Sequence, residues 1–290
     1  MSAQIVDGKL IADKILQRLK AKISKENLHP VLAVVLVGKD KPSQTYVRKK
    51  QEAAESIGVK FLLYEFPQTI KNENLVFEMK KIQKQNISGI IVQLPLPKSI
   101  DKKLILNQLD SDLDVDYLSW ESLGKLVVGE NTLIPPAPGA VLEILNQFKI
   151  PLKGKHIVLV GQGDLIGKPL TNLLMHMPVT LSVCNKYTKD LKTLTMQADV
   201  LITGAGKYNL IRGDMIKPGA VVIDAGVSFE KGKMHGDVNF DEIYKKAKLV
   251  TPTPGGVGPI TVAKLLENTV AIAEKKTSGS KYQKTLNLKI

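Results

Sequence analysis

The sequence predicts an α/β protein with two αβ domains around a cleft, and three features lead to this fold class. Helix-type and strand-type segments alternate along most of the 290 residues, which is typical of parallel sheets covered by helices. The alternation fails between about residues 110 and 140, where aspartates, glycines and prolines cluster, so a domain junction is expected there. A glycine-rich turn directly after a buried-type strand at 156–160 predicts that the second domain is a Rossmann-like, doubly wound parallel sheet.

The first half of the chain begins with a helix and alternates from there. Ile11, Ile15 and Leu19 recur at helical spacing and form an apolar stripe on one face. A β-branched run follows at 31–37 and ends at a glycine, as expected of a buried strand. The expected elements of this half are helix 8–23, strand 31–37, helix 43–57, strand 60–64, helix 74–85 and strand 89–93.

The second half resumes the alternation after the irregular segment. Its expected elements are helix 140–147, strand 156–160, helix 167–176, strands 180–183, 200–203, 220–224 and 248–251, and helix 259–275. We therefore expect a first domain over residues 1–118, completed by the helix at 259–275, and a second domain over residues 119–258. Residues 276–290 are expected to form a basic, partly disordered tail, because they include four lysines and no acidic residue.

The composition is that of a globular protein. Apolar residues make up 43% of the chain and charged residues 24%, which is enough to bury a sizeable core. No apolar run approaches the roughly 18 residues of a membrane span, and the first fifteen residues lack the apolar stretch of a secretory signal. The single cysteine, Cys184, excludes an intramolecular disulfide framework. We expect a cytoplasmic protein with no membrane partner.

The net charge of +13, from 41 basic and 28 acidic side chains, has two interpretations. It can form a surface for nucleic acid, or it can attract small anionic ligands. Aromatic residues make up 5% of the chain, which leaves little for base stacking, and no nucleic-acid recognition motif is present. We therefore expect small polyanionic ligands and no nucleic-acid partner.

A metal site is not expected. Asp110, Asp112, Asp114 and Asp116 alternate in a way that imitates a calcium-binding loop, but Val115 stands where such a loop requires glycine. A zinc site is equally unsupported, because the one cysteine and the four histidines are scattered along the chain.

The turn from Gly161 to Gly167 is a candidate phosphate-binding loop. Glycines there let the backbone approach a phosphate and direct the amides of the next helix toward it. The spacing, GxGxxxG, is also compatible with a plain tight turn. Lys186 follows the next strand, at the place where an NAD-selective enzyme usually has an acidic residue. A lysine suits a 2′-phosphate and favours NADP, and the alternative is a solvated loop lysine.

The loop at 251–259 combines three glycines with Pro259 at the start of a helix. Proline suits the first helical turn, and the glycines free backbone amides for an anion or a flat ring. The spacing alone is equally compatible with a tight structural turn and with a ligand-binding loop.

Tyr46 and Lys50 are four residues apart in an expected helix, so both side chains project from one face. Crowding by Arg48 and Lys49, together with partial burial, would lower the pKa of Lys50 and make a neutral amine accessible. A neutral amine can act as a general base. The alternative is a solvated surface lysine.

Taken together, these segments resemble the bifunctional methylenetetrahydrofolate dehydrogenase/methenyltetrahydrofolate cyclohydrolase family, from Leu32 to about Ile272. The most specific motifs are Tyr-x-x-x-Lys at 46–50, Val-Gln-Leu-Pro-Leu-Pro at 92–97 and Pro-Gly-Gly-Val-Gly-Pro at 254–259. The remaining matching segments, in the family's order, are 32–38, 114–116, 161–169 and 222–224.

The resemblance implies an enzyme that oxidises methylene-tetrahydrofolate to methenyl-tetrahydrofolate with NADP and then hydrolyses the product to formyl-tetrahydrofolate. Such an oxidoreductase and hydrolase belongs to one-carbon metabolism and purine biosynthesis. The first domain would bind tetrahydrofolate derivatives and the second would bind NADP. The resemblance also implies a homodimer, formed through the second domain. The alternative is a divergent member that retains only one of the two activities, or that uses NAD.

The resemblance assigns roles to individual residues as well. Lys50 would be the central catalytic group that assists proton transfer in hydrolysis, and Gln93 would hydrogen-bond it. Tyr46 would pack on the folate ring and Asp116 would bind the pterin edge. The expected substrate site comprises these four residues with Leu94, Gly256, Gly258 and Pro259. The expected cofactor site comprises Gly161, Gln162, Gly163, Asp164, Ile166, Gly167, Lys186 and Val227.

The chain departs from the common family pattern at several of these motifs. Tyr117 and Leu118 stand where glycine and phenylalanine are common, and Ala137 stands where a threonine hydroxyl is common. Gln162-Gly163 replaces a frequent Arg-Ser, and Asn185-Lys186 replaces a frequent His-Ser. These departures motivate the alternative of a single activity or a different cofactor.

Overall fold

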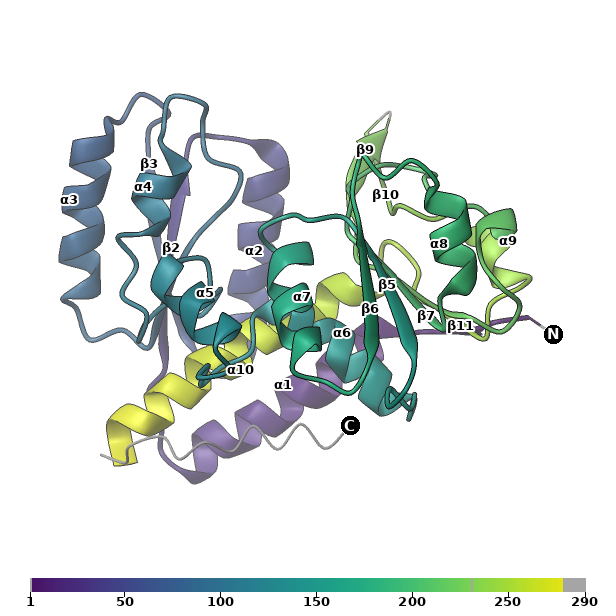
Figure 1. The fold of residues 1–290 in the computed structure, drawn as a ribbon. Coiled ribbons are helices and arrows are strands. Elements are labelled where there is room, and N and C mark those ends of the chain that lie inside the picture. The colour runs from purple at the N-terminus through teal and green to yellow at the C-terminus, as the bar shows by residue number, and fades with distance from the viewer. Residues whose placement is uncertain (1, 231, 279–290) are drawn as a thin grey trace. The chain divides into compact units, whose positions relative to one another are not determined.

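The structure is a computed structural model that describes residues 2–230 and 232–278 (Figure 1). The chain forms two compact units. Within the described ranges, unit 1 contains residues 2–12 and 137–261, and unit 2 contains residues 13–136 and 262–278. Two of the boundaries fall inside the first and the last helix, so each of these helices contributes residues to both units.

Unit 2 is built on a three-stranded parallel sheet in the order β3-β2-β4. The central strand β2 (Val31–Val37) pairs with β3 (Lys60–Phe66) and with β4 (Gly89–Val92). Residues 32–37 are all buried, as expected of a parallel strand whose two faces are covered. Because the strands are parallel, their carboxyl ends share one edge of the sheet, and Gln93 follows β4 at that edge.

Helices complete unit 2, and local capping determines where several of them begin. They are α1 (Gly8–Lys25) from residue 13, α2 (Lys41–Ser56), α3 (Asn72–Gln83), α4 (Lys102–Leu106), α5 (Trp120–Val127) and α10 (Val257–Ser278) from residue 262. The carboxylate of Asp40 accepts a hydrogen bond from the Ser43 amide and so caps α2. Ion pairs join α1 to α10, including Lys22 with Glu274 at 2.7 Å.

Unit 1 is built on a six-stranded parallel sheet in the order β1-β11-β8-β7-β5-β6. Its strands are β1 (Gln4–Ile5), β5 (His156–Val160), β6 (Thr180–Cys184), β7 (Val200–Thr203), β8 (Val221–Asp224) and β11 (Leu249–Val250). Without β1, the chain order across the sheet is that of a doubly wound fold whose switch point lies between β5 and β7. A separate hairpin pairs β9 (Ser228–Glu230) with β10 (Lys233–His235).

Helices cover both faces of the unit 1 sheet. They are α6 (Pro136–Gln147), α7 (Gly167–Met175), α8 (Leu191–Gln197) and α9 (Phe240–Tyr244), with a 3₁₀ turn at Gly213–Met215. In Figure 1, α6 and α7 lie on one face of the sheet, and α8 and α9 lie on the other. A core of buried aliphatic residues fills the second of these layers and includes Leu201, Val222 and Ile243.

The predicted α/β class with a doubly wound parallel sheet is confirmed. The predicted strands 31–37, 156–160 and 200–203 have the same limits in the structure, and the other predicted strands agree within two residues at each end. The irregular segment is less irregular than predicted, because α5 occupies residues 120–127. The Ser119 side chain accepts a hydrogen bond from the Ser122 amide and caps this helix.

The compact units divide the chain at other points than the sequence-based boundaries 118/119 and 258/259. Residues 119–136 belong to unit 2, and the Asn268 side chain of α10 donates hydrogen bonds to the carbonyls of Val115 and Ile134. Of the expected basic tail, residues 276–278 are helical, and residues 279–290 lie outside the described residues. In the part of the chain that the structure describes, no helix is long and apolar enough to cross a membrane.

Candidate functional site

Lys50 of α2 and Gln93, which follows β4, are joined in unit 2 by a hydrogen bond. The Gln93 amide donates to the Val35 carbonyl at 2.8 Å, and its side-chain Nε2 donates to the Leu94 carbonyl at 2.7 Å. These two bonds fix the orientation of the side chain, so that Oε1 faces away from its own backbone. Lys50 Nζ donates to that oxygen at 3.0 Å. The sequence-predicted partnership of these two residues is therefore present in the geometry.

Burial and the nearby carboxylate of Asp116 shift the pKa of Lys50 in opposite directions. Burial lowers the pKa of the Lys50 ammonium from its usual range, and the attraction of Asp116 opposes that decrease. Burial likewise raises the pKa of Asp116, with Lys50 opposing the increase and Asp114 adding to it. Lys50 and Asp116 therefore form an electrostatically coupled pair in which burial favours the neutral amine.

Asp114, two residues before Asp116, anchors the segment that carries it. Asp114 is fully buried and its carboxylate accepts hydrogen bonds from the amides of Leu118 and Ser119, the latter at 2.8 Å. Its backbone forms an isolated bridge with Ile90 of β4. The sequence motif contained Asp114, but its anchoring role was not predicted. The pattern Asp-x-Asp beside a buried strand is the signal that points to it.

Tyr46 lies one helical turn before Lys50 on α2 and is half-buried. Burial raises the pKa of its phenol, so the side chain presents a neutral ring. The structure thus brings Lys50, Gln93, Leu94 and Asp116 together, with Tyr46 on the same helix face as Lys50. This cluster can transfer protons at a bound ligand through a buried amine.

In unit 1, the turn from Gly161 to Gly167 follows β5 and leads into α7. Gly161 has φ +111°, and a Cβ there would lie 2.5 Å from the Gly204 carbonyl oxygen, which belongs to the loop after β7. A Cβ at Gly167 would overlap the Gly161 carbonyl. Both positions therefore require glycine, and this close approach occurs at the switch point between β5 and β7.

The side chains of this turn link it to the loop after β6. Gln162 Oε1 accepts a hydrogen bond from Asn185 Nδ2 at 3.0 Å, which places Lys186 beside the turn. Lys186 is exposed, and its Nζ lies 4.9 Å from the centroid of the Tyr187 ring. The Asp164 carboxylate, which would repel a phosphate, pairs with Lys168 at 2.5 Å.

The other residues predicted for the ligand sites also belong to unit 1. Ile166 packs against Gly204 and begins α7 without a side-chain cap, and Gly163 faces open space. Val227 follows β8 and is 42% exposed. The predicted substrate residues Gly256, Gly258 and Pro259 lie at the start of α10.

These features fit a dinucleotide. An uncapped helix start next to a closed glycine turn presents backbone amides to a pyrophosphate. A lysine after β6 provides the positive charge that a 2′-phosphate requires. Within residues 2–230 and 232–278, no His, Cys, Asp and Glu side chains group in a way that could hold a metal ion.

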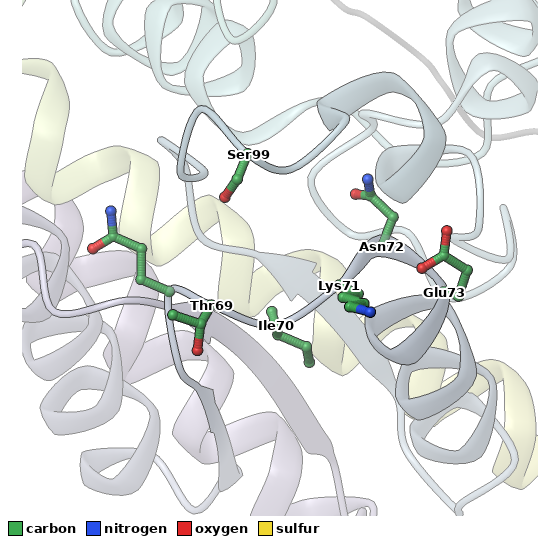
Figure 2. A pocket seen from close by; sticks show the side chains of 7 residues that line it. Thr69, Ile70, Lys71, Asn72, Glu73 and Ser99 are labelled. Atoms are coloured by element: carbon green, nitrogen blue, oxygen red, sulfur yellow. The ribbon is translucent and has the colours of Figure 1, made fainter.

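Two cavities lie apart from these clusters. One, of about 630 Å³, lies in unit 2 between the loop after β3 and the start of α3, with Ser99 on a further loop (Figure 2). Its lining includes none of the predicted site residues. The other, of about 240 Å³, lies in unit 1 and is lined by polar residues that include Asp224, His235 and Thr251.

Family models cover both parts of the chain. The model described as the catalytic domain of tetrahydrofolate dehydrogenase/cyclohydrolase matches residues 6–116, which include the Lys50 cluster. The model described as the NAD(P)-binding domain of tetrahydrofolate dehydrogenase/cyclohydrolase matches residues 135–277, which include the glycine turn. The two matches follow one another along the chain, in the order that the sequence motifs predict.

Individual proteins and solved structures are similar over nearly their whole length. The bifunctional protein FolD of Nautilia profundicola is 43% identical over 275 residues, covering 93% of this chain and 97% of that protein. The crystal structure of FolD from Campylobacter jejuni superposes with a TM-score of 0.91 at 40% identity, covering 95% of this chain and all of that one. The Trypanosoma brucei enzyme, complexed with NADP and an inhibitor, gives a TM-score of 0.92 at 33% identity, covering 96% and 99%. The chain therefore belongs to the tetrahydrofolate dehydrogenase/cyclohydrolase family.

Proposed function

We propose that this chain carries out both reactions of its family through the residues of the two clusters described above. It oxidises methylene-tetrahydrofolate to methenyl-tetrahydrofolate with NADP, and it hydrolyses the methenyl product to formyl-tetrahydrofolate. The two family matches and the bifunctional relatives support both activities. The observation that carries the assignment of residues is the hydrogen bond from Lys50 Nζ to Gln93 Oε1 beside Asp116.

Lys50 moves the protons of the hydrolytic reaction. Water adds to the methenyl carbon, and the neutral Lys50 amine accepts a proton from the attacking oxygen. The resulting ammonium then donates a proton to the ring nitrogen as one carbon–nitrogen bond breaks. The reaction consumes one water, forms the formyl group and releases one proton, so atoms and charge balance. Burial of Lys50 promotes the first step, because it lowers the pKa of the ammonium.

The neighbours of Lys50 orient it and the substrate. Gln93 accepts a hydrogen bond from Nζ and thereby holds the amine in one position. Asp116 binds the hydrogen-bonding edge of the pterin, and Tyr46 packs against the flat ring. Leu94 contributes to the wall of this site. The family resemblance also assigns substrate contacts to Gly256, Gly258 and Pro259 of unit 1.

The residues of the glycine turn hold the cofactor. NADP supplies the hydride acceptor for the oxidation of the methylene carbon. Gly161, Gly163, Ile166 and Gly167 shape the backbone that approaches the pyrophosphate, and Lys186 binds the 2′-phosphate. Gln162 ties the turn to the loop that carries Lys186, while Asp164 neutralises Lys168 and Val227 contacts the cofactor.

A direct assay tests the proposal. Purified protein is mixed with methylene-tetrahydrofolate and either NADP or NAD, and NADPH and methenyl absorbance are followed. Hydrolysis is measured separately by starting from methenyl-tetrahydrofolate without cofactor. We expect turnover in both assays and a preference for NADP. Turnover in only one assay would support the single-activity alternative, and turnover in neither would refute the proposal.

We further propose that the enzyme is a cytoplasmic homodimer that supplies formyl groups for purine biosynthesis. The family resemblance motivates each part of this proposal. A chain with one buried cysteine, Cys184, needs no oxidising compartment. The strand β6 ends the sheet of unit 1 and offers an edge for association through the second domain. Light scattering tests the dimer, since a monomer mass at micromolar concentration would contradict it.

We also assign the positive charge of the chain to its anionic ligands rather than to nucleic acid. Folate derivatives and NADP both carry several negative charges, which a basic surface concentrates. The Michaelis constants are then expected to rise with salt concentration. Tight binding of single-stranded or double-stranded DNA fragments at low salt would contradict this assignment.

A further inference from the structure

Asp224 is buried at the carboxyl end of β8, where it collects hydrogen bonds from three segments. Its Oδ1 accepts from the Thr203 hydroxyl and from the Gly226 amide, each at 3.0 Å, and its Oδ2 accepts from the Val238 amide at 3.1 Å. The Asp224 amide donates to the Thr251 hydroxyl at 2.7 Å. Asp224 thus connects the end of β7 with the loops that follow β8 and β11 and with the segment after β10.

Asp237 is a second fully buried carboxylate in the same place. Its Oδ2 accepts from the Ala205 amide at 2.6 Å and its Oδ1 accepts from the Lys207 amide at 2.7 Å. It therefore holds the loop after β7 by two short bonds. The Thr203 hydroxyl interacts with this carboxylate as well as with Asp224.

Within the described residues, neither buried carboxylate has a cationic partner, because none of the ion pairs there includes Asp224 or Asp237. Burial and the proximity of Asp237 raise the pKa of Asp224 to about 6. A Cβ at Gly236 would overlap the Asp224 carboxylate, and a Cβ at Gly226 would overlap the Asp237 carboxylate. Burying two like-charged groups costs free energy, and a functional constraint on these loops would explain their retention.

The sheet order indicates which part of the cofactor these loops face. Lys186 follows β6, which lies on one side of β5, and the braced loops follow β7 and β8, which lie on the other side. With the pyrophosphate at the Gly161 turn after β5 and the 2′-phosphate at Lys186, the nicotinamide end extends toward β7 and β8. Val227, a predicted cofactor residue, is next to Gly226, whose amide donates to Asp224.

We propose that Asp224 and Asp237 are positioning residues of the dehydrogenase reaction, which hold the loops at 204–207 and 225–227 in the conformation that receives the nicotinamide half of NADP. The inference rests on the proposed function for the identity of the cofactor. It assigns neither residue a contact with the reacting atoms. Because hydrolysis of methenyl-tetrahydrofolate needs no hydride acceptor, the two carboxylates are dispensable for that reaction.

Binding measurements with two ligands test the proposal. The variants Asp224→Asn and Asp237→Asn keep the shape of each side chain but replace one acceptor oxygen with a donor. Calorimetry gives the dissociation constants for NADP and for adenosine 2′,5′-bisphosphate, which lacks the nicotinamide half. We expect about a tenfold increase for NADP and an unchanged value for the fragment. Hydrolysis from methenyl-tetrahydrofolate should stay within about twofold of wild type, because it uses the Lys50 cluster.

A matched control lies at the other end of the same sheet. Asp199 precedes β7, and its carboxylate accepts from the His156 amide at 2.9 Å and from Lys217 at 2.6 Å. Asp199→Asn makes the same chemical change at the amino edge, so it should leave NADP binding unchanged. Circular dichroism establishes that each variant is folded. If Asp224→Asn does not fold, Thr203→Val removes the hydroxyl that interacts with both carboxylates, at constant shape, and about a threefold weaker NADP binding is expected.

The two ligands distinguish positioning from general destabilisation. Equal weakening of NADP and of adenosine 2′,5′-bisphosphate, or a parallel loss of hydrolysis, would overturn the proposal. Unchanged NADP binding in a folded Asp224 or Thr203 variant would overturn it too. Failure of the proposed function is a separate result, because it would appear as absent turnover in the wild-type protein.

Discussion

Lys50 Nζ lies 3.0 Å from Gln93 Oε1, and this contact makes the lysine a donor in both of its protonation states. The amide group of Gln93 cannot rotate to offer a donor, because its Nε2 is held by the Leu94 carbonyl. A neutral amine has two hydrogens to donate and one lone pair. With one hydrogen bonded to Gln93, the lone pair is directed elsewhere and can accept a proton from water.

Replacing Lys50 should abolish hydrolysis while leaving the fold intact. Lys50→Gln removes the proton acceptor but preserves a long polar side chain on α2. We expect hydrolysis of methenyl-tetrahydrofolate to fall by about 10²- to 10⁴-fold, the usual contribution of a general base. Lys49→Gln is the matched control, since Lys49 is exposed and one residue away on the same helix.

The dehydrogenase reaction of the same variant provides an internal comparison. Hydride transfer requires no proton exchange with Lys50, so oxidation of methylene-tetrahydrofolate should decrease less than hydrolysis does. Undiminished hydrolysis in a folded Lys50→Gln variant would refute the role of this residue. A comparable loss of hydrolysis in Lys49→Gln would show that the reaction depends on the positive charge of α2 and not on the Lys50 amine.

Asp116 should set the pH at which hydrolysis becomes fast. Its negative charge raises the pKa of Lys50, in opposition to burial. Asp116→Asn removes that attraction, so the pKa of Lys50 decreases and the neutral amine forms at lower pH. We expect the rising limb of kcat for hydrolysis to move to lower pH, measured at saturating methenyl-tetrahydrofolate after subtraction of the uncatalysed rate.

A second carboxylate from the same segment serves as the control for this profile. Asp112 is exposed and lies 3.6 Å from Lys275, so Asp112→Asn should leave the profile in place. The Michaelis constant of the Asp116 variant should rise as well, because one of the two carboxylate oxygens that accept from the pterin edge becomes a donor and the negative charge is lost. If the rising limb of kcat in Asp116→Asn stays at the same pH or moves to higher pH, the electrostatic coupling of Asp116 to Lys50 is contradicted.

Lys186 should discriminate between NADP and NAD. It follows β6 and is held beside the glycine turn by the bond between Asn185 and Gln162. Lys186→Ala removes the positive charge expected at the 2′-phosphate, so the Michaelis constant for NADP should rise about tenfold and that for NAD should change little. Lys189→Ala, an exposed lysine three residues later, is the control. An equal change for both cofactors would exclude a phosphate contact.

Runs of apolar residues predicted eight of the strands because they are a local property of buried parallel strands, whereas the two-residue edge strand β1 and the hairpin strands β9 and β10 were not predicted. The run at 31–37 is apolar at every position, and no other element of the described residues has that pattern at that length. The helix α5 was missed for the opposite reason. It lies among aspartates and glycines, and its start depends on a cap from Ser119 that propensity does not reveal.

The candidate site was predictable only as far as its motifs are contiguous in sequence. Lys50 and Gln93 are 43 residues apart, so their spacing does not connect them, and only the family resemblance predicts their hydrogen bond. Asp224 and Asp237 form their bonds across loops that no spacing rule connects, including the bond from Ala205 to Asp237 over 32 residues. Hydrogen bonds between such loops depend on the order of the strands in the sheet, which a single sequence does not specify.

Tyr117 occupies a backbone conformation that favours glycine, and its side chain compensates for this. Its φ is +59°, it is 3% exposed, and its hydroxyl accepts a hydrogen bond from the Leu133 amide at 3.2 Å. Glycine is common at this position among the proteins that the motif resembles. Tyr117 thus costs backbone strain, and burial of its ring and the hydrogen bond to the Leu133 amide offset that cost.

Tyr117→Phe should therefore destabilise unit 2 without changing catalysis. Loss of the hydroxyl leaves the Leu133 amide without its acceptor, so we expect the free energy of unfolding to fall by about 1 kcal/mol. Urea unfolding followed by tryptophan fluorescence measures this, because the single tryptophan, Trp120, lies in unit 2.

Tyr117→Gly should lower the free energy of unfolding further than Tyr117→Phe does. The cavity left by the ring costs about 3 to 5 kcal/mol, which exceeds the roughly 1 kcal/mol of relieved backbone strain. An unchanged urea midpoint in Tyr117→Phe would show that the ring alone stabilises this turn, and a loss of hydrolysis at full stability would show that the hydroxyl acts on the neighbouring Asp116.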